Sequence, residues 1–190
     1  MSITELCLEV EGLLGRFRED SSSPKEQKLL LVAIDALNFI SATGQSHEFE
    51  DYLKRVETDA PPLVIASFDT REEAETWLEN HPHPPRIANV LIGGEYYSAM
   101  CSRERNDRRL VRTQTLEYYL AAMIRDGIPP SVATFNTQEE ATAWVHGQPE
   151  PPRQVFIHIA GAAYLVVYHD KVNLRAIYPL SRAAKNVNWD

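Results

Sequence analysis

The chain opens with two stretches in which apolar residues recur at helical spacing. In residues 3–18 they recur every three or four positions, which predicts an amphipathic helix. The second stretch starts with Ser23, Pro24 and Glu26, which predicts a capping box, and it stops at Gly44. Apolar residues cover more than one face of the predicted 24–43 helix. Such a helix is central in a core or lies in an oligomer interface, and the pattern leaves both interpretations open.

After these helices the chain repeats itself at a constant offset. FEDYLKRVETDAPP (49–62) recurs as LEYYLAAMIRDGIP (116–129), and FDTREEAETWLENHPHPPR (68–86) recurs as FNTQEEATAWVHGQPEPPR (135–153). About 20 of some 50 aligned positions are identical without a gap, which indicates an internal duplication. We call residues 47–112 repeat A and residues 113–180 repeat B. Residues 1–46 are then a helical pair, and residues 181–190 are a C-terminal tail.

Each repeat has the pattern of a helix, a short strand, a capped helix, a long strand and a last strand. The long strand is predicted over 88–101 in repeat A and 155–168 in repeat B, where Gly93-Gly94 and Gly161 indicate bulges or hairpin turns. The predicted fold is therefore α+β: a helical pair followed by two tandem α-β-α-β-β repeats with a pseudo-twofold relation and a mostly antiparallel sheet. The six predicted strands form either one sheet or two three-stranded sheets.

Composition and charge narrow the classes of partner. The formal net charge is -8, and residues 1–60 hold twelve acidic against six basic residues. This argues against nucleic acid or an anionic membrane as a partner, because both attract a basic face. The longest apolar run, 29–34, is shorter than a membrane span, and the N-terminal residues have no signal-peptide pattern. We therefore expect a cytoplasmic protein of bacterial type.

The residues shared by both repeats are mainly those of a scaffold. Glu72 and Glu73 lie in a predicted first helical turn, where they favour the helix dipole and the cap. Arg86 follows Pro-Pro, as Arg153 does in repeat B; a salt bridge or carbonyl contact is the structural interpretation, and an anion-binding pair is the functional one. His81 and its neighbour His83 are not repeated, and two cysteines make no ligand pattern, so we expect no metal site.

The string F-x-T-x-E-E-A-x-x-W-[LV], present in both repeats, resembles the strand–helix junction of SPOR-type peptidoglycan-binding repeats. The resemblance covers about a dozen residues per repeat, in positions that a capped helix after a strand also requires. Peptidoglycan binding would require export, for which the N-terminus has no signal pattern. We transfer no functional residue from this resemblance.

The surface that differs between the repeats is the best candidate for binding a partner. The segment CSRERNDRRLVR (101–112) is a basic hairpin found only in repeat A, and arginine-rich turns bind acidic surfaces or shield an edge strand. Tyrosine pairs at 96–97 and 118–119 add aromatic contact potential. The predicted partner-binding residues are Arg103, Arg105, Arg108, Arg109, Tyr96 and Tyr118.

Three functions remain open from the sequence. The first is a non-enzymatic protein-binding module, for instance an inhibitor of the immunity or antitoxin type. The second is a small-ligand sensor with a pocket between the repeats. The third is an enzyme that uses His158 or Cys101, for which no catalytic motif is present. We expect a protein partner, no cofactor and no catalytic residues, and leave homo-oligomerisation open.

Overall fold

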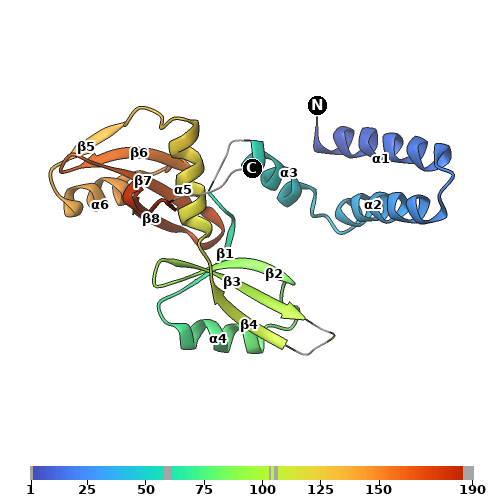
Figure 1. Cartoon of the computed structure of the whole chain (residues 1–190), viewed down its shortest axis with the longest axis horizontal. Helices are drawn as coiled ribbons and strands as arrows, with labels where there is room; N and C mark the ends of the chain where they lie inside the picture. Colours follow the sequence, from blue (N-terminus) through green and yellow to red (C-terminus); the bar gives the residue numbers. More distant parts are fainter. Residues whose placement is uncertain (1, 58–60, 103, 105–106, 186–190) are drawn as a thin grey trace. The chain divides into compact units, whose positions relative to one another are not determined.

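The computed structural model describes residues 2–57, 61–102, 104 and 107–185 of an α+β protein (Figure 1). Its contacts divide the chain into an N-terminal unit, Met1–Asp59, and a C-terminal unit, Ala60–Asp190. The first unit is helical. The second contains two four-stranded sheets with helices. The finer division predicted from the sequence, with a boundary at residue 46, stays a prediction.

The N-terminal unit consists of three helices: α1 (Ile3–Asp20), α2 (Pro24–Ala42) and α3 (Ser46–Glu57). The α1 helix starts with a complete capping box between Ser2 and Glu5. In α2 the Ser23 hydroxyl accepts a hydrogen bond from the backbone N–H of Glu26, with Pro24 in the first turn, as predicted. The Glu26 carboxylate, however, accepts a hydrogen bond from the Ser21 hydroxyl, so it binds the preceding loop.

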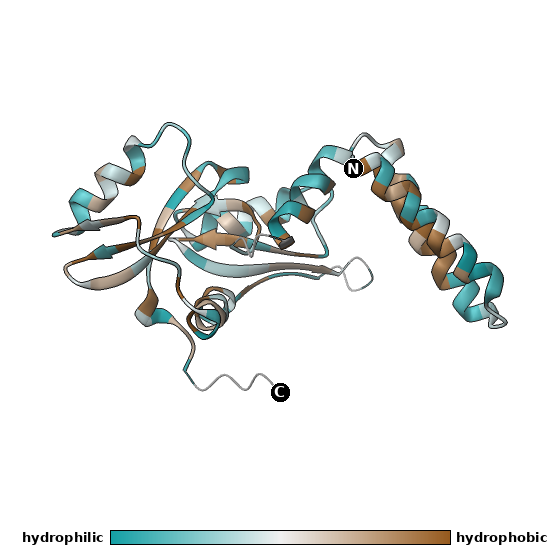
Figure 2. Cartoon of the chain, turned by 90° about the horizontal axis from the view of Figure 1, so that it is seen from above, coloured by the Kyte–Doolittle hydropathy of each residue, from teal (hydrophilic) through white to brown (hydrophobic). Residues whose placement is uncertain are grey.

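The N-terminal unit buries very little of its apolar surface. Among its described residues, only Cys7 and Arg55 are buried, although α1 packs against α2. Figure 2 shows apolar residues recurring along both helices. Among the described residues, no single helix is long and apolar enough to cross a membrane. The α2 helix and residues 46–56 of α3 pass the same test of length and composition together, as a pair bent by 117°.

The first sheet, which we call sheet A, has the order β1-β2-β3-β4. Strand β1 (Val64–Phe68) is followed by α4 (Arg71–Asn80) and pairs in parallel with β2 (Ile87–Ile92). Strands β3 (Glu95–Ser102) and β4 (Asp107–Arg112) extend the sheet by antiparallel pairing. The capping box predicted for α4 is present, between Thr70 and Glu73.

The second sheet, sheet B, has the same pairing in the order β5-β6-β7-β8. Helix α5 (Thr115–Asp126) leads into β5 (Ala133–Phe135), α6 (Gln138–Gly147) and β6 (Gln154–Ile159). Strand β7 (Ala162–His169), the 3-10 turn η1 (Asp170–Val172), strand β8 (Leu174–Pro179) and the 3-10 turn η2 (Leu180–Arg182) complete the unit. The two halves thus share one order of elements.

The predicted count of six strands is wrong, because each predicted long strand is a hairpin of two strands. In repeat A the turn is made by Gly93 and Gly94, with φ of 57° and 78°. In repeat B it is made by Ala160 and Gly161, with φ of 50° and 80°. Two successive residues with positive φ make the kind of tight turn that reverses a chain between antiparallel strands. Each repeat is therefore α-β-α-β-β-β, and the sheets have four strands each.

Three apolar clusters hold the C-terminal unit together. Each sheet packs one face on its own crossover helix, α4 for sheet A and α6 for sheet B, with Trp77 and Trp144 partly buried there. The third cluster is shared between the repeats and contains Val64, Leu91 and Tyr96 of repeat A. Repeat B contributes the buried α5 residues Leu116 and Leu120 and the sheet B residues Phe156, Leu165, Val167 and Tyr178. The repeats therefore meet at an apolar core to which they contribute different positions.

Candidate functional site

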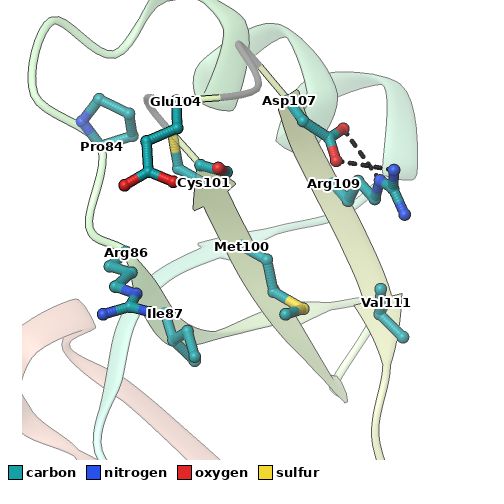
Figure 3. A pocket seen from close by; sticks show the side chains of 10 residues that line it. Pro84, Arg86, Ile87, Met100, Cys101, Glu104, Asp107, Arg109 and Val111 are labelled. Carbon is teal, nitrogen blue, oxygen red and sulfur yellow. Dashed lines mark hydrogen bonds and ion pairs between the residues drawn. The ribbon is translucent and has the colours of Figure 1, made fainter.

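A groove of about 730 Å³ lies on sheet A, on the face turned away from α4 (Figure 3). Its floor is formed by Ile87, Met100 and Val111, from three adjacent strands. Ile87 pairs with Met100 across β2 and β3, and Val111 pairs with Ser98 across β3 and β4. Because side chains alternate along a strand, these three residues lie on the face opposite the α4-facing Val90, Ala99 and Leu110. We call this feature the open groove.

The floor of the open groove is exposed although its residues are apolar. The exposed fractions are 62% for Ile87, 40% for Met100 and 45% for Val111. At its other end the same face carries Leu91 and Tyr96, which are buried in the core shared with repeat B. One sheet face is therefore half covered and half open, and the open half is apolar in its middle.

The rim of the open groove carries both signs of charge. The Arg109 guanidinium binds the carboxylate of Asp107, with nitrogen–oxygen distances of 2.7 and 2.9 Å. Arg86 and Glu104 line the same groove, and Cys101, a free and half-buried thiol, lies beside them. An apolar floor with a polar rim is the anatomy of a protein-binding patch.

Repeat B shows what covers the matching face in the same protein. At the offset that aligns the repeats, the counterparts of Met100 and Val111 are Val167 and Tyr178, which are 0% and 4% exposed. They belong to the cluster that contains Leu116 and Leu120 of α5, and Tyr119 of the same helix donates a hydrogen bond to Gln154. This face of sheet B is thus covered by α5, whose apolar residues recur at i, i+3, i+4 and i+7, together with Leu91 and Tyr96 of repeat A.

The arginines predicted to bind a partner separate into different roles. Arg103 and Arg105 lie outside the described residues. Arg109 lies at the open groove, as described above. Arg108 is on the other face of β4, where its guanidinium donates to the carbonyls of Leu78, Glu79 and His81 at the end of α4, at 2.5 Å to Leu78 and 3.3 Å to His81. These contacts are made by Nη1 and the residue is exposed, so Arg108 caps α4 and its role as a partner contact stays a prediction.

Arg175 confirms that this capping role belongs to the repeat. It is the counterpart of Arg108 in repeat B, and its guanidinium donates to the carbonyls of Val145 and His146, at 2.8 and 2.7 Å, at the end of α6. The last carbonyls of a helix have no partner within the helix, so an arginine from the neighbouring strand satisfies them. Arg108 and Arg175 align at the constant offset between the repeats, so extending the repeat alignment to these positions would have predicted their shared role.

The two predicted tyrosines also have different environments. Tyr118 is 48% exposed on α5, so it is accessible to a partner. Tyr96 is 1% exposed, and the prediction that it lies on a binding surface is wrong. Its ring packs in the shared core and its hydroxyl donates to the carbonyl of Pro62, at 3.5 Å. The pattern of the strand did not reveal this burial, because the face of Tyr96 is covered by the other repeat.

Sequence reasoning missed a polar cluster where the repeats join. The Arg182 guanidinium donates two hydrogen bonds to Glu95, of 2.9 and 2.7 Å, and one of 3.1 Å to Glu117. Nearby, the buried His169 lies 3.4 Å from the hydroxyl of Tyr178 and meets the Tyr96 ring edge-on at 5.9 Å. These residues come from both repeats and the segment after β8, so only the fold brings them together.

The electrostatics of this cluster follow from its burial and its ion pairs. Burial acts to raise the pKa of Glu95, but hydrogen bonds from Arg182 and Arg112 outweigh it and hold that pKa below its usual value. Burial raises the pKa of Tyr96 and that of Tyr178 far above the usual value of tyrosine. Both phenols are therefore neutral at physiological pH, which suits a structural junction.

The residues considered for catalysis are scattered. His158 pairs with Ala163 across β6 and β7 on sheet B, whereas Cys101 lies at the open groove on sheet A. His81 accepts a hydrogen bond at Nδ1 from the backbone N–H of His83, which makes it part of a turn. Among the described residues, no group of three or more His, Cys, Asp or Glu side chains is arranged to hold a metal ion.

Comparison with known proteins identifies no relative: no family model, no curated protein and no solved structure matches the chain.

Proposed function

We propose that the protein is a non-enzymatic protein-binding module whose open groove receives an amphipathic helix of a partner protein. One observation carries this proposal: the apolar floor at Ile87, Met100 and Val111 is exposed, whereas the matching face of sheet B is covered by α5 and by part of repeat A. Removing apolar area from water contributes roughly 25 cal/mol per Å², so covering this floor favours binding. The charges of the rim then select the orientation of the helix.

We further propose that the protein is an inhibitor of the immunity or antitoxin type and that the partner is its target. The acidic N-terminal third and the small size of the chain support this class. The cytoplasm is the proposed place of the interaction, because Cys7 and Cys101 are both free thiols, as is typical of a reducing compartment.

The proposal is tested by photo-crosslinking from the groove floor. In cells that produce the protein, Met100→p-benzoylphenylalanine is expected to form one discrete adduct with a partner protein, through a segment with apolar residues at i, i+3, i+4 and i+7. The same substitution at Val132, which is 59% exposed on repeat B, is the matched control. With the purified partner, Met100→Glu should weaken binding at least tenfold by calorimetry, and Val132→Glu should leave it unchanged.

Two results would overturn the proposal. The first is an adduct that joins position 100 only to this chain itself or to a second copy of it. The second is partner binding that Met100→Glu does not weaken.

The volume of the groove also falls in the range of small-molecule sites. A metabolite panel in a thermal-shift assay therefore provides the alternative outcome: a shift abolished by Met100→Glu, without a protein adduct, would indicate a ligand sensor.

A further inference from the structure

The α2 helix carries an exposed apolar stripe that the hairpin with α1 does not use. Its residues are Leu29, Val32, Ala36 and Phe39, and the three larger ones are 63%, 58% and 59% exposed. The half-buried residues Leu30, Ile34 and Leu37 lie about 150° away around the helix at ~100° per residue. The α2 helix is therefore apolar on two sides; α1 packs against it extensively, and α3 makes a smaller contact.

The N-terminal unit lacks the core that two such helices need. Cys7 is the buried apolar residue among its described positions. Two helices of 18 and 19 residues gain stability when further helices cover their remaining apolar sides. A stripe with steps of three and four residues is the spacing by which helices pack side by side.

We propose that a second copy of this chain covers the stripe, with the two α2 helices antiparallel and in contact, each flanked by its own α1. The four stripe positions are separated by three, four and three residues, so the pattern is the same from either end. Antiparallel pairing sets Leu29 against Phe39 of the second copy and Val32 against Ala36 of the second copy. The stripe is thus complementary to itself, as the interface of a twofold dimer must be.

Charge selects the antiparallel direction. Lys25 and Lys28 lie in the first turns of α2, and Asp35 lies near its middle. A parallel pair in register would bring each lysine close to its own copy and to a second positive helix end, which is unfavourable. Asp35 lies close to its own copy in either direction. In the antiparallel pair the two lysines lie near the C-terminal end of the other α2 helix, where the helix dipole favours a positive charge.

The oligomeric state of the whole chain tests this inference. Light scattering after size-exclusion chromatography should give twice the chain mass of 21.6 kDa. Leu29→Glu should convert the protein to a monomer at the same concentration. Leu8→Glu is the matched control, because Leu8 is equally exposed, at 62%, but lies on α1 outside the stripe. Circular dichroism checks that both variants keep their helices.

Disulfide trapping tests the direction of pairing even if Leu29→Glu unfolds the unit. In a Cys101→Ser background, the Leu29→Cys variant and a tagged Phe39→Cys variant are prepared. Each variant is oxidised by itself, and a mixture of the two is oxidised in parallel. The mixture should give a disulfide-linked dimer of the two variants, at least tenfold more of it than either variant alone gives. In the antiparallel pair, equivalent Leu29→Cys positions are about 15 Å apart along the axis, too far for a disulfide.

Four outcomes would overturn the inference. A monomeric parent chain removes it, and so does a dimer that Leu29→Glu leaves intact. Trapping of Leu29→Cys alone would replace the antiparallel pair with a parallel one. Sedimentation of the monomer with anionic phospholipid vesicles, abolished by Leu29→Glu, would show that the stripe meets a lipid surface instead.

Discussion

At the scale of single residues, the two carboxylates that face Arg182 are the most informative. Glu95 and Glu117 come from different elements, and the shared guanidinium keeps them from repelling each other. The Arg182 side chain is 26% exposed, so these ion pairs are shielded more than an ordinary surface pair. The Arg182 guanidinium also lies over the Tyr178 ring, at 5.9 Å from its centre. The position therefore links the segment after β8 to both repeats.

We expect Glu95→Gln to destabilise the C-terminal unit by about 1–2 kcal/mol at neutral pH, because hydrogen bonds to a charged group are lost. The pKa of Glu95 is lowered in the folded protein, so its contribution is fully present above the unfolded pKa of about 4.3. That contribution is lost as the pH falls through the lower folded pKa. The parent chain should therefore lose more stability than the variant between pH 6 and about pH 3.

Urea unfolding followed by tryptophan fluorescence measures this difference. Of the described residues, the tryptophans are Trp77 and Trp144, both in the C-terminal unit. Glu150→Gln, which removes an exposed carboxylate from a turn, is the control and should leave the pH dependence unchanged. Equal pH dependence in the parent chain and in Glu95→Gln would contradict the role assigned to this ion pair.

At the scale of elements, the arginines that cap α4 and α6 give a matched pair of tests. We expect Arg108→Ala and Arg175→Ala each to destabilise the C-terminal unit by about 1 kcal/mol, because helix carbonyls lose their donor. Arg109→Ala removes an exposed pair with Asp107 and should cost less than about 0.5 kcal/mol. Urea denaturation of the three variants measures these differences. A larger cost for Arg109→Ala than for Arg108→Ala would reject the capping role.

The sequence repeat predicted most helices and strands, and particular residues show which features it could not predict. The capping boxes and the helix after each Thr-x-x-Glu string follow from local hydrogen bonding, so Thr70 and Glu73 were predictable from sequence. The strand count was wrong because Gly93-Gly94 is as compatible with a bulge as with a turn. The burial of Tyr96 and the exposure of Met100 depend on which part of one sheet face the other repeat covers. That choice is made by tertiary packing, which a strand pattern does not encode.

At the scale of the whole molecule, the two units differ in how they bury apolar surface. The C-terminal unit has three apolar clusters within one chain, so its stability does not require a partner. The N-terminal unit exposes the α2 stripe, so under the proposed pairing its stability depends on protein concentration. The chain should therefore unfold in two steps, because its contacts divide it into two units.

We expect the concentration dependence to appear only in the helical step. A tenfold rise in protein concentration favours the paired state by about 1.4 kcal/mol per dimer, which should raise the midpoint of that step by a few degrees. Circular dichroism follows the helices of both units, and tryptophan fluorescence follows the C-terminal unit. The helical step is therefore the dichroism transition that fluorescence does not show, and both midpoints can be measured on one sample. The fluorescence midpoint should stay constant. Leu29→Glu should abolish the shift of the helical step, whereas Leu8→Glu should preserve it. A helical step that is independent of concentration in the parent chain would show that α2 is stabilised within a single copy.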